Sequence, residues 1–214
     1  MRLLIFSDIH GNLPALENVL NKEKANVDGY INLGDVVNYG PWSNECVELV
    51  SELKDCHHIL GNHEEYFINK YCDVENPLVL DFYHHCIEGF KYTETIRAYN
   101  KSLIINEFKV IHTLGVKDYI FHDSDIELTG NMLIGHSHQQ FLRVIDGFTI
   151  VNPGSIGQNR KYINVSNYVI WDWERNTFEL RELKFDLNIL LNEMKAQNYP
   201  LSCIEYYQSK KTTN

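Results

Sequence analysis

Short apolar segments that each end in a polar turn recur along the chain, and this pattern constrains the fold more than any other feature. Residues 2–6 form an apolar run of strand length, and apolar residues at helical spacing follow over residues 13–20. Asn12 is a suitable N-cap for that helix, and Pro14 falls in its first turn. A strand, a polar loop and a helix in this order predict the first unit of an α/β fold.

The same pattern continues up to residue 65. Residues 29–33 are expected to form a second strand, and Ser43 is expected to cap the helix that follows it. Residues 57–60 form a third, brief strand. Residues 65–100 contain no clear strand and are expected to form a short, helical, cap-like segment.

Strands dominate the later part of the chain. Residues 113–129 are expected to form an irregular polar loop, and Asp146-Gly147 suits a type I′ hairpin turn. The other expected elements are strands at 103–105, 109–112, 132–134, 141–145, 148–151, 168–173 and 178–183, and a helix at 186–195. Because neither a repeat nor a linker interrupts this order, one domain over residues 1–214 is expected.

Aspartate, asparagine and histidine side chains follow five of the expected strands. In open α/β sheets the carboxyl ends of the strands border the binding crevice, so these side chains are expected to lie close together. Oxygen and nitrogen ligands of this kind suit Mn, Fe, Zn or Ni. They are too many for one tetrahedral ion, which favours two metal ions that share a bridging carboxylate. The residues are Asp8, His10, Asp35, Asn62, His63, His112, His136 and His138.

The composition argues against several other classes of protein. The chain has 29 acidic against 19 basic residues and a net charge of −10, which disfavours binding of long duplex nucleic acid. Its five cysteines form no C-x-x-C pair, which argues against a disulfide framework or a zinc ribbon. The N-terminal apolar run is too short for a signal peptide, and no apolar run has the length of a membrane span. A cytoplasmic location without a membrane partner is therefore expected.

Five motifs in a fixed order resemble the calcineurin-like metallophosphoesterases, in particular their bacterial and archaeal branch of small phosphodiesterases. The motifs are Asp8-Ile9-His10, Gly34-Asp35, Gly61-Asn62-His63-Glu64, His112 and Gly135-His136-Ser137-His138. Each motif is weak alone, whereas five in order are specific. Residues 152–160 also resemble that branch and are interpreted as a turn that supports the site. The resemblance extends to about residue 184.

This resemblance implies a four-layer α/β/β/α sandwich, in which two mixed sheets are flanked by helices. It also implies two divalent transition metals per chain, Mn or Fe, with Zn or Ni as alternatives. Asp8, His10 and His138 would hold one metal, Asn62, His112 and His136 the second, and Asp35 would bridge them. A hydroxide between the metals would attack phosphorus, and His63 would face the leaving-group oxygen and protonate or stabilise it.

Two residues distinguish the chain from the protein phosphatases of this family. Asn38 and Tyr39 stand where those enzymes have an Asp that orients the catalytic His and an Arg that binds phosphate. Arg160 is the candidate to bind phosphate instead. We therefore expect hydrolysis of phosphodiester bonds in a small, nucleotide-like substrate. The alternatives are a phosphomonoesterase or protein phosphatase, and a non-catalytic scaffold, which the complete ligand set disfavours. A homo-oligomer remains open.

No catalytic or metal-binding role is expected for the remaining histidines and the polar residues near them. Pairs of histidines at 57–58 and 84–85 lack partners at ligand spacing and are interpreted as surface or packing residues. His122, Asp123 and Asp125 are interpreted as a solvated acidic loop, and Tyr206-Tyr207 as a packing or partner contact.

Overall fold

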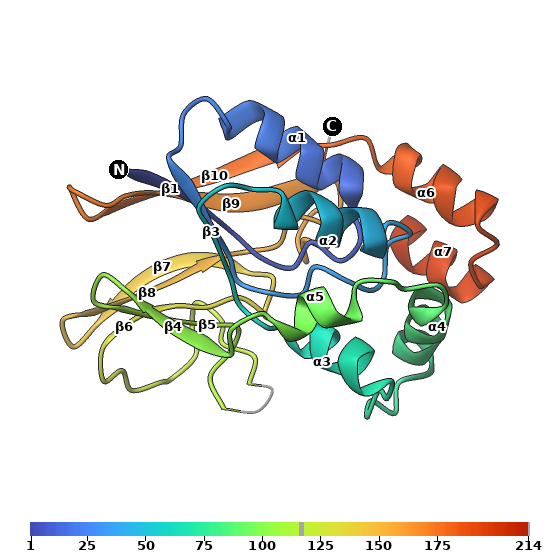
Figure 1. The fold of residues 1–214 in the computed structure, drawn as a ribbon, viewed down its shortest axis with the longest axis horizontal. Helices are drawn as coiled ribbons and strands as arrows, with labels where there is room; N and C mark the ends of the chain where they lie inside the picture. Colours follow the sequence, from blue (N-terminus) through green and yellow to red (C-terminus); the bar gives the residue numbers. More distant parts are fainter. Residues whose placement is uncertain (116–117, 214) are drawn as a thin grey trace.

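The strands of the chain form two five-stranded sheets that face each other (Figure 1). The computed structural model describes residues 1–115 and 118–213. The first sheet has the order β10-β9-β1-β2-β3 and contains β1 (Arg2–Phe6), β2 (Gly29–Asn32), β3 (Cys56–His58), β9 (Val165–Asp172) and β10 (Thr177–Lys184). The second has the order β4-β5-β6-β8-β7 and contains β4 (Ser102–Ile105), β5 (Phe108–Ile111), β6 (Asn131–Leu133), β7 (Gln140–Ile145) and β8 (Phe148–Pro153).

Both sheets are mixed. In the first, β1, β2 and β3 are parallel, and β9 and β10 pair antiparallel at the other side of β1. In the second, β5, β6 and β8 are parallel, whereas β4 and β7 are antiparallel edge strands. The parallel strands bring their carboxyl ends to one edge of each sheet, and this edge carries the polar loops.

Alternation along β1 explains how the first sheet is buried on both faces. Leu3 and Ile5 point between the two sheets, where they pack with Trp171. Leu4 and Phe6 point the other way, into a larger core that the helices cover. A strand buried on both faces reads as a continuous apolar run, which is what the sequence shows at residues 2–6.

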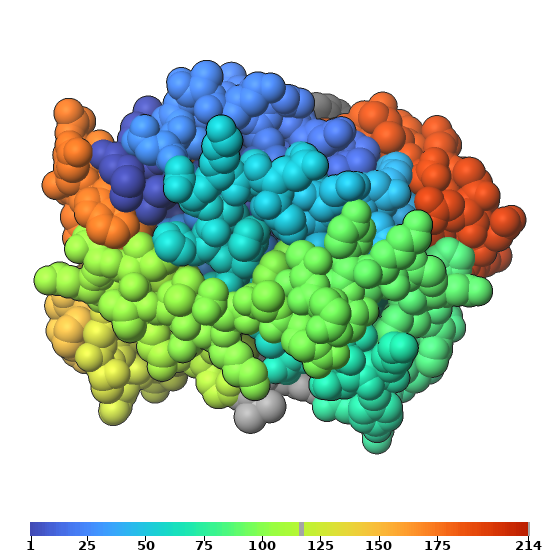
Figure 2. Space-filling model, viewed as in Figure 1, coloured from blue at the N-terminus to red at the C-terminus, as the bar shows by residue number. Residues whose placement is uncertain are grey.

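Seven helices occur in the described residues (Figure 1). They are α1 (Leu13–Glu23), α2 (Ser43–Ser51), α3 (Asn62–Asn69), α4 (Pro77–Ile87), α5 (Thr93–Arg97), α6 (Leu187–Ala196) and α7 (Leu201–Gln208). α1 and α2 lie side by side, as the blue and cyan atoms of Figure 2 show, and they pack on the first sheet. α7 packs against α4 and α6. None of the helices in the described part of the chain has the length and apolar character that a bilayer crossing requires.

The outer face of the second sheet is covered partly by the segment that follows β5. Ile120 and Leu128 of this segment are buried against Met132 and Ile150 of the sheet. The expected fold class, two mixed sheets flanked by helices, is confirmed.

Two local expectations were wrong. Ser43 is the first residue of α2 and Trp42 is its N-cap, because the Ser43 hydroxyl accepts a hydrogen bond from the Asn38 N–H instead (3.0 Å). Helix α7 was not predicted: its buried residues Cys203, Ile204 and Tyr207 have helical spacing but span little more than one turn, which is too short to establish a period.

Candidate metal centre

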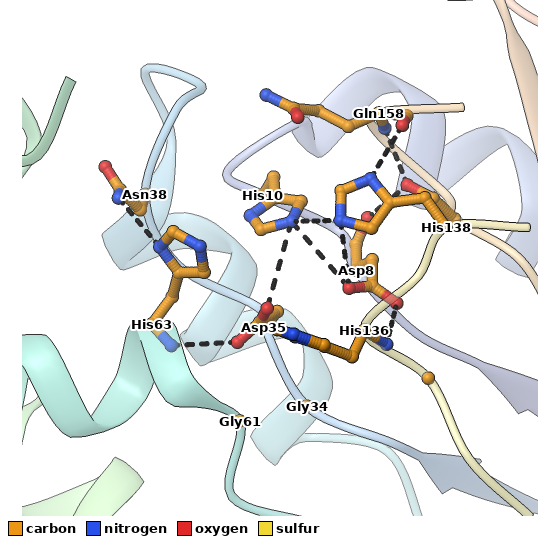
Figure 3. A network of polar contacts seen from close by, with 12 residues as sticks. Asp8, His10, Gly34, Asp35, Asn38, Gly61, His63, His136, His138 and Gln158 are labelled. Carbon is orange, nitrogen blue, oxygen red and sulfur yellow. Dashed lines mark hydrogen bonds and ion pairs between the residues drawn. The ribbon is translucent and has the colours of Figure 1, made fainter. Parts of the chain in front are cut away.

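The polar residues that follow the strands converge at the edge where the two sheets meet (Figure 3). The loops after β1, β2 and β3 bring residues from the first sheet, and those after β5 and β6 bring residues from the second. All but Asn62, which is half-buried, are buried. The structure therefore brings together Asp8, His10, Asp35, Asn62, His63, His112, His136 and His138.

One group of ligand atoms is formed by Asp8, His10 and His138. His138 Nε2 lies 3.2 Å from Asp8 Oδ1 and 3.2 Å from His10 Nε2. The other oxygen of Asp8 accepts a hydrogen bond from the His136 N–H (3.1 Å), so Oδ1 is left to face the two imidazoles. Burial opposes the Asp8 charge, but His138 and His112 together outweigh it and lower the pKa of Asp8 to about 2.

A second group contains Asp35, His112 and His136, with Asn62 beside them. His112 Nε2 lies 3.1 Å from Asp35 Oδ2, 3.2 Å from His136 Nδ1 and 3.2 Å from Asn62 Oδ1. Burial disfavours charge on His112, yet the Asp35 carboxylate raises the pKa of His112 to about 10. The Asp35 carboxylate therefore strongly favours a positive charge at the position of His112.

Asp35 lies between the two groups. Its Oδ1 accepts a hydrogen bond from the His63 N–H (2.9 Å), which directs Oδ2 inward. Oδ2 is 3.1 Å from His112 Nε2 and 4.0 Å from His10 Nε2, so one carboxylate oxygen faces both groups. This is the position that a bridging carboxylate requires.

The proton positions of the imidazoles show that the cluster fits cations. His10 Nδ1 faces the Val37 carbonyl at 3.3 Å, and His138 Nδ1 faces the Gln158 carbonyl at 2.8 Å, so each ring carries its proton on Nδ1. The two Nε2 lone pairs then face each other at 3.2 Å. Asp8 Oδ1 is buried without a hydrogen-bond donor. A divalent cation between these atoms would be coordinated by both Nε2 lone pairs and by Asp8 Oδ1, which otherwise repel one another.

His63 lies beside the cluster and has a different environment (Figure 3). Asn38 Nδ2 donates to His63 Nδ1 (2.8 Å), and the amide orientation is set by the Tyr39 N–H, which donates to Asn38 Oδ1 (2.8 Å). The neutral His63 ring therefore holds its proton on Nε2. Burial lowers the pKa of His63 to about 4, although Asp35 acts in the opposite direction. Its ring also lies within ligand distance of His10 and Asp35, so distance alone does not separate it from the ligands.

Glu64 ties two of the site loops together, a role that sequence reasoning missed. It is fully buried, and its Oε2 accepts hydrogen bonds from the N–H groups of Asp35 (2.7 Å) and Gly61 (2.9 Å). Its Oε1 accepts from Val36 (2.7 Å) and Val37 (3.2 Å). Its place at the end of the Gly61-Asn62-His63-Glu64 motif was the available signal.

The backbone at the site is strained. Non-glycine residues rarely adopt positive φ, because Cβ then crowds the carbonyl oxygen. Positive φ occurs at Asp8 (53°), His10 (50°), Asp35 (56°), His136 (66°) and His138 (57°). The loops that carry the cluster are therefore held in conformations that their residue types do not favour.

Residues 152–160 support the site from behind, as expected. The Ser155 hydroxyl donates to the Asp8 carbonyl (2.7 Å), and Asn152 Nδ2 donates to the Gly135 carbonyl (2.7 Å). Gln158 orients His138 through its carbonyl, and its amide donates to the Tyr207 hydroxyl (3.1 Å). Tyr207 is thus a packing residue, as interpreted, that also steadies the loop beside the site.

The other residues singled out in the sequence lie outside the cluster. The His58 ring stacks on Tyr99 at 4.8 Å, and that of His85 packs on Tyr199 at 3.8 Å. Arg160 is exposed and lines two hollows beside the cluster, of about 520 and 320 Å³. It is therefore within the site region, although no hydrogen bond ties it to the ligands.

The fold and the cluster together define a metallophosphoesterase. Residues 1–199 match the family model described as calcineurin-like phosphoesterase, and the chain belongs to this family. Its similarity to an uncharacterized protein of Methanocaldococcus jannaschii is 31% identity over 237 residues, which cover 92% of this chain and 93% of the relative. Members of the family bind divalent metals and act on phosphoesters.

Solved structures show the same fold. A metallophosphoesterase from Sphaerobacter thermophilus superimposes with a TM-score of 0.79 at 24% identity and covers 98% of both chains. A hypothetical protein from Pyrococcus horikoshii OT3 has a TM-score of 0.81 at 17% identity, with 96% of this chain and 97% of that chain covered. A structure described as a novel archaeal phosphodiesterase has a TM-score of 0.53 at 18% identity, with 86% and 100% covered.

Proposed function

We propose that this protein hydrolyses phosphodiester bonds of small, nucleotide-like substrates with two divalent cations. Asp8, His10 and His138 would hold one cation, Asn62, His112 and His136 would hold the other, and Asp35 would bridge them. The observation that carries this proposal is the lone-pair contact of His10 and His138 at 3.2 Å, with the Asp35 oxygen facing both groups. Mn and Fe are the metals that we expect, and Zn or Ni would also suit the donors.

When bound, the two cations supply a water of lowered pKa near neutral pH and neutralise charge on the phosphate oxygens. The chain supplies the rest. His63 carries its proton on Nε2, because Asn38 donates to Nδ1. We assign to His63 a hydrogen bond from its Nε2–H to the leaving-group oxygen, which stabilises the negative charge that develops there and matters most for alkoxides because they leave poorly.

The charge around the centre supports a diester rather than a monoester. Tyr39 stands beside His10 and His63, with ring centroids at 4.9 and 5.2 Å. Burial raises the pKa of Tyr39 well above its usual range, so the phenol is neutral. A diester carries one negative charge and a monoester about two, so the diester needs less cationic support. Arg160 supplies a single positive charge at the edge of the centre.

The test is hydrolysis of bis-p-nitrophenyl phosphate and p-nitrophenyl phosphate by metal-stripped protein titrated with Mn. We expect Mn-dependent turnover with the diester preferred, and a fall in kcat of about 10²–10⁴-fold in His63→Ala. Preference for the monoester would replace the proposal with a phosphomonoesterase. Absence of both turnover and retained metal would favour a non-catalytic scaffold.

Arg160→Ala separates phosphate binding from chemistry. We expect this variant to raise KM more than it lowers kcat, because Arg160 lies at the rim of the centre rather than among the ligands. A fall in kcat at unchanged KM would contradict this role.

A further inference from the structure

Two exposed aromatic rings stand beside the metal centre and take no part in the chemistry proposed above. Tyr119 is 52% exposed and Phe121 is 39% exposed. Their rings are nearly parallel, with 10° between the planes and 6.2 Å between centroids. The Tyr119 ring also stacks on His136 at 4.3 Å. The rings of His136, Tyr119 and Phe121 therefore stack in this order, from a proposed metal ligand to the exposed surface.

The segment that carries these rings is anchored to the second sheet. Ile120, between the two aromatic residues, is 7% exposed and is part of a buried apolar cluster. The His122 N–H donates to Gln139 Oε1 (2.7 Å). Ile120 points inward and the backbone after it is hydrogen-bonded, so Tyr119 and Phe121 point outward. Because this segment is already ordered, binding a ligand to the two rings would cost little further conformational entropy.

A hollow of about 320 Å³ lies against the rings. It is lined by Tyr119, Phe121, Ser137 and Arg160. Ser137 lies between His136 and His138 in the chain, which belong to the two groups of proposed ligands. The hollow therefore lies next to the metal centre.

Arg160 brings positive charge to this hollow. Burial raises the pKa of both the Tyr39 and the Tyr206 hydroxyl, and the charge of Arg160 acts in the opposite direction on both. The Lys210 ammonium lies 4.2 Å from the centroid of the Tyr206 ring. The lining of the hollow thus combines a cationic side chain, suited to phosphate, with two planar aromatic rings.

We propose that Tyr119 and Phe121 form a stacking subsite for a planar aromatic group joined to the scissile phosphate, a nucleobase in the natural substrate. Arg160 binds phosphate oxygens while the base lies against the aromatic rings. This inference rests on the proposed phosphodiesterase function and adds the residues that select the substrate. Stacking on aromatic side chains tolerates every base, so the subsite selects nucleotides over alkyl phosphates rather than one base over another.

The kinetic test compares two Mn-supported reactions that share a leaving group. The substrates are the methyl esters of adenosine 5′-monophosphate and of ribose 5-phosphate, which both release methanol and differ only in the base, and the measured quantity is the ratio of their kcat/KM values. We expect Phe121→Ala to lower this ratio at least about fivefold, and Phe121→Leu to lower it too, because leucine keeps apolar volume but has no ring face. Phe148→Ala is the matched control, since Phe148 is 36% exposed at the far end of β8 and should leave the ratio unchanged.

A binding measurement tests the same subsite without turnover. Calorimetric titration with adenosine 5′-monophosphate and with ribose 5-phosphate gives the preference for a base, which Phe121→Ala should lower at least about fivefold and Phe148→Ala should not change. If neither ester is cleaved by the wild-type protein, the phosphodiesterase function fails, and the binding preference still decides the subsite. If both esters are cleaved and the ratio and the binding preference are the same in the wild type and the Phe121 variants, the subsite is wrong and the function stands.

Discussion

Glu64 offers the sharpest test of how the site loops are held. The change Glu64→Gln replaces one carboxylate oxygen by an NH₂ group, which cannot accept a hydrogen bond. Each oxygen of Glu64 accepts two backbone N–H groups, so either orientation of the amide leaves two buried donors without an acceptor. Glu64→Ala leaves four.

The size of the effect follows from this count. A buried polar group that loses its partner costs about 1–3 kcal/mol, and part of that cost is recovered by relaxation of the loops. We therefore expect Glu64→Gln to lower the free energy of unfolding by about 3 kcal/mol and Glu64→Ala by about 5 kcal/mol. These values exceed the effect of most single substitutions.

The measurement is urea unfolding followed by circular dichroism. Burial and the Asp35 charge raise the pKa of Glu64 to about 7, so the comparison is made at pH 8, where Glu64 is ionised. With a slope of about 2 kcal/mol per molar urea, the midpoint should fall by about 1.5 M for Glu64→Gln. Glu65→Gln is the matched control, because Glu65 is exposed in the same turn of α3 and should change the midpoint little.

One outcome would refute this reasoning. If Glu64→Gln unfolds within about 1 kcal/mol of the wild type with the same slope, the four N–H groups do not depend on the carboxylate. The positions of Asp35 and Gly61 would then need another explanation.

Two further predictions test close packing and pH dependence. In Gly61→Ala the new Cβ would overlap the Asp35 carboxylate, so we expect weaker Mn binding in calorimetric titration. Gly130→Ala is the control: its Cβ meets no atom within 4 Å, so this variant should bind Mn as the wild type does. Burial lowers the pKa of His58 to about 4, so as pH falls from about 6.5 the unfolded chain takes up this proton first and stability is lost towards pH 4. His58→Gln should therefore reduce the loss of unfolding free energy between pH 7 and 4.5 by about 2–3 kcal/mol in urea titrations, and an unchanged loss would contradict the prediction.

The order of strands and polar turns predicted much of the site, for a physical reason. Parallel strands bring their carboxyl ends to one edge, so residues such as Asp8, Asp35 and His136 must meet once the strands pair. The assignment of individual ligands to each metal, and of His63 to the leaving group, stays a prediction of the resemblance.

Features that depend on contacts between distant segments were not predicted. The sequence around Tyr119 and Phe121 has no period, and only the packing of Ile120 against the second sheet places the rings beside His136. Glu64 likewise resembles an ordinary residue of a first helical turn until the loop after β2 is brought against it. Such roles follow from tertiary structure, which local propensity does not encode.

The left-handed backbone at five of the seven proposed ligands bears on how a lineage of such proteins diverges. Each of these positions costs about 1–2 kcal/mol that glycine would not incur. A change such as His10→Gly thus removes a ligand and relieves conformational strain in one mutation. At these positions selection for catalysis opposes selection for stability, because the ligand residue has the higher backbone energy. A lineage that no longer needs catalysis can therefore gain stability and lose its metal site by a single substitution.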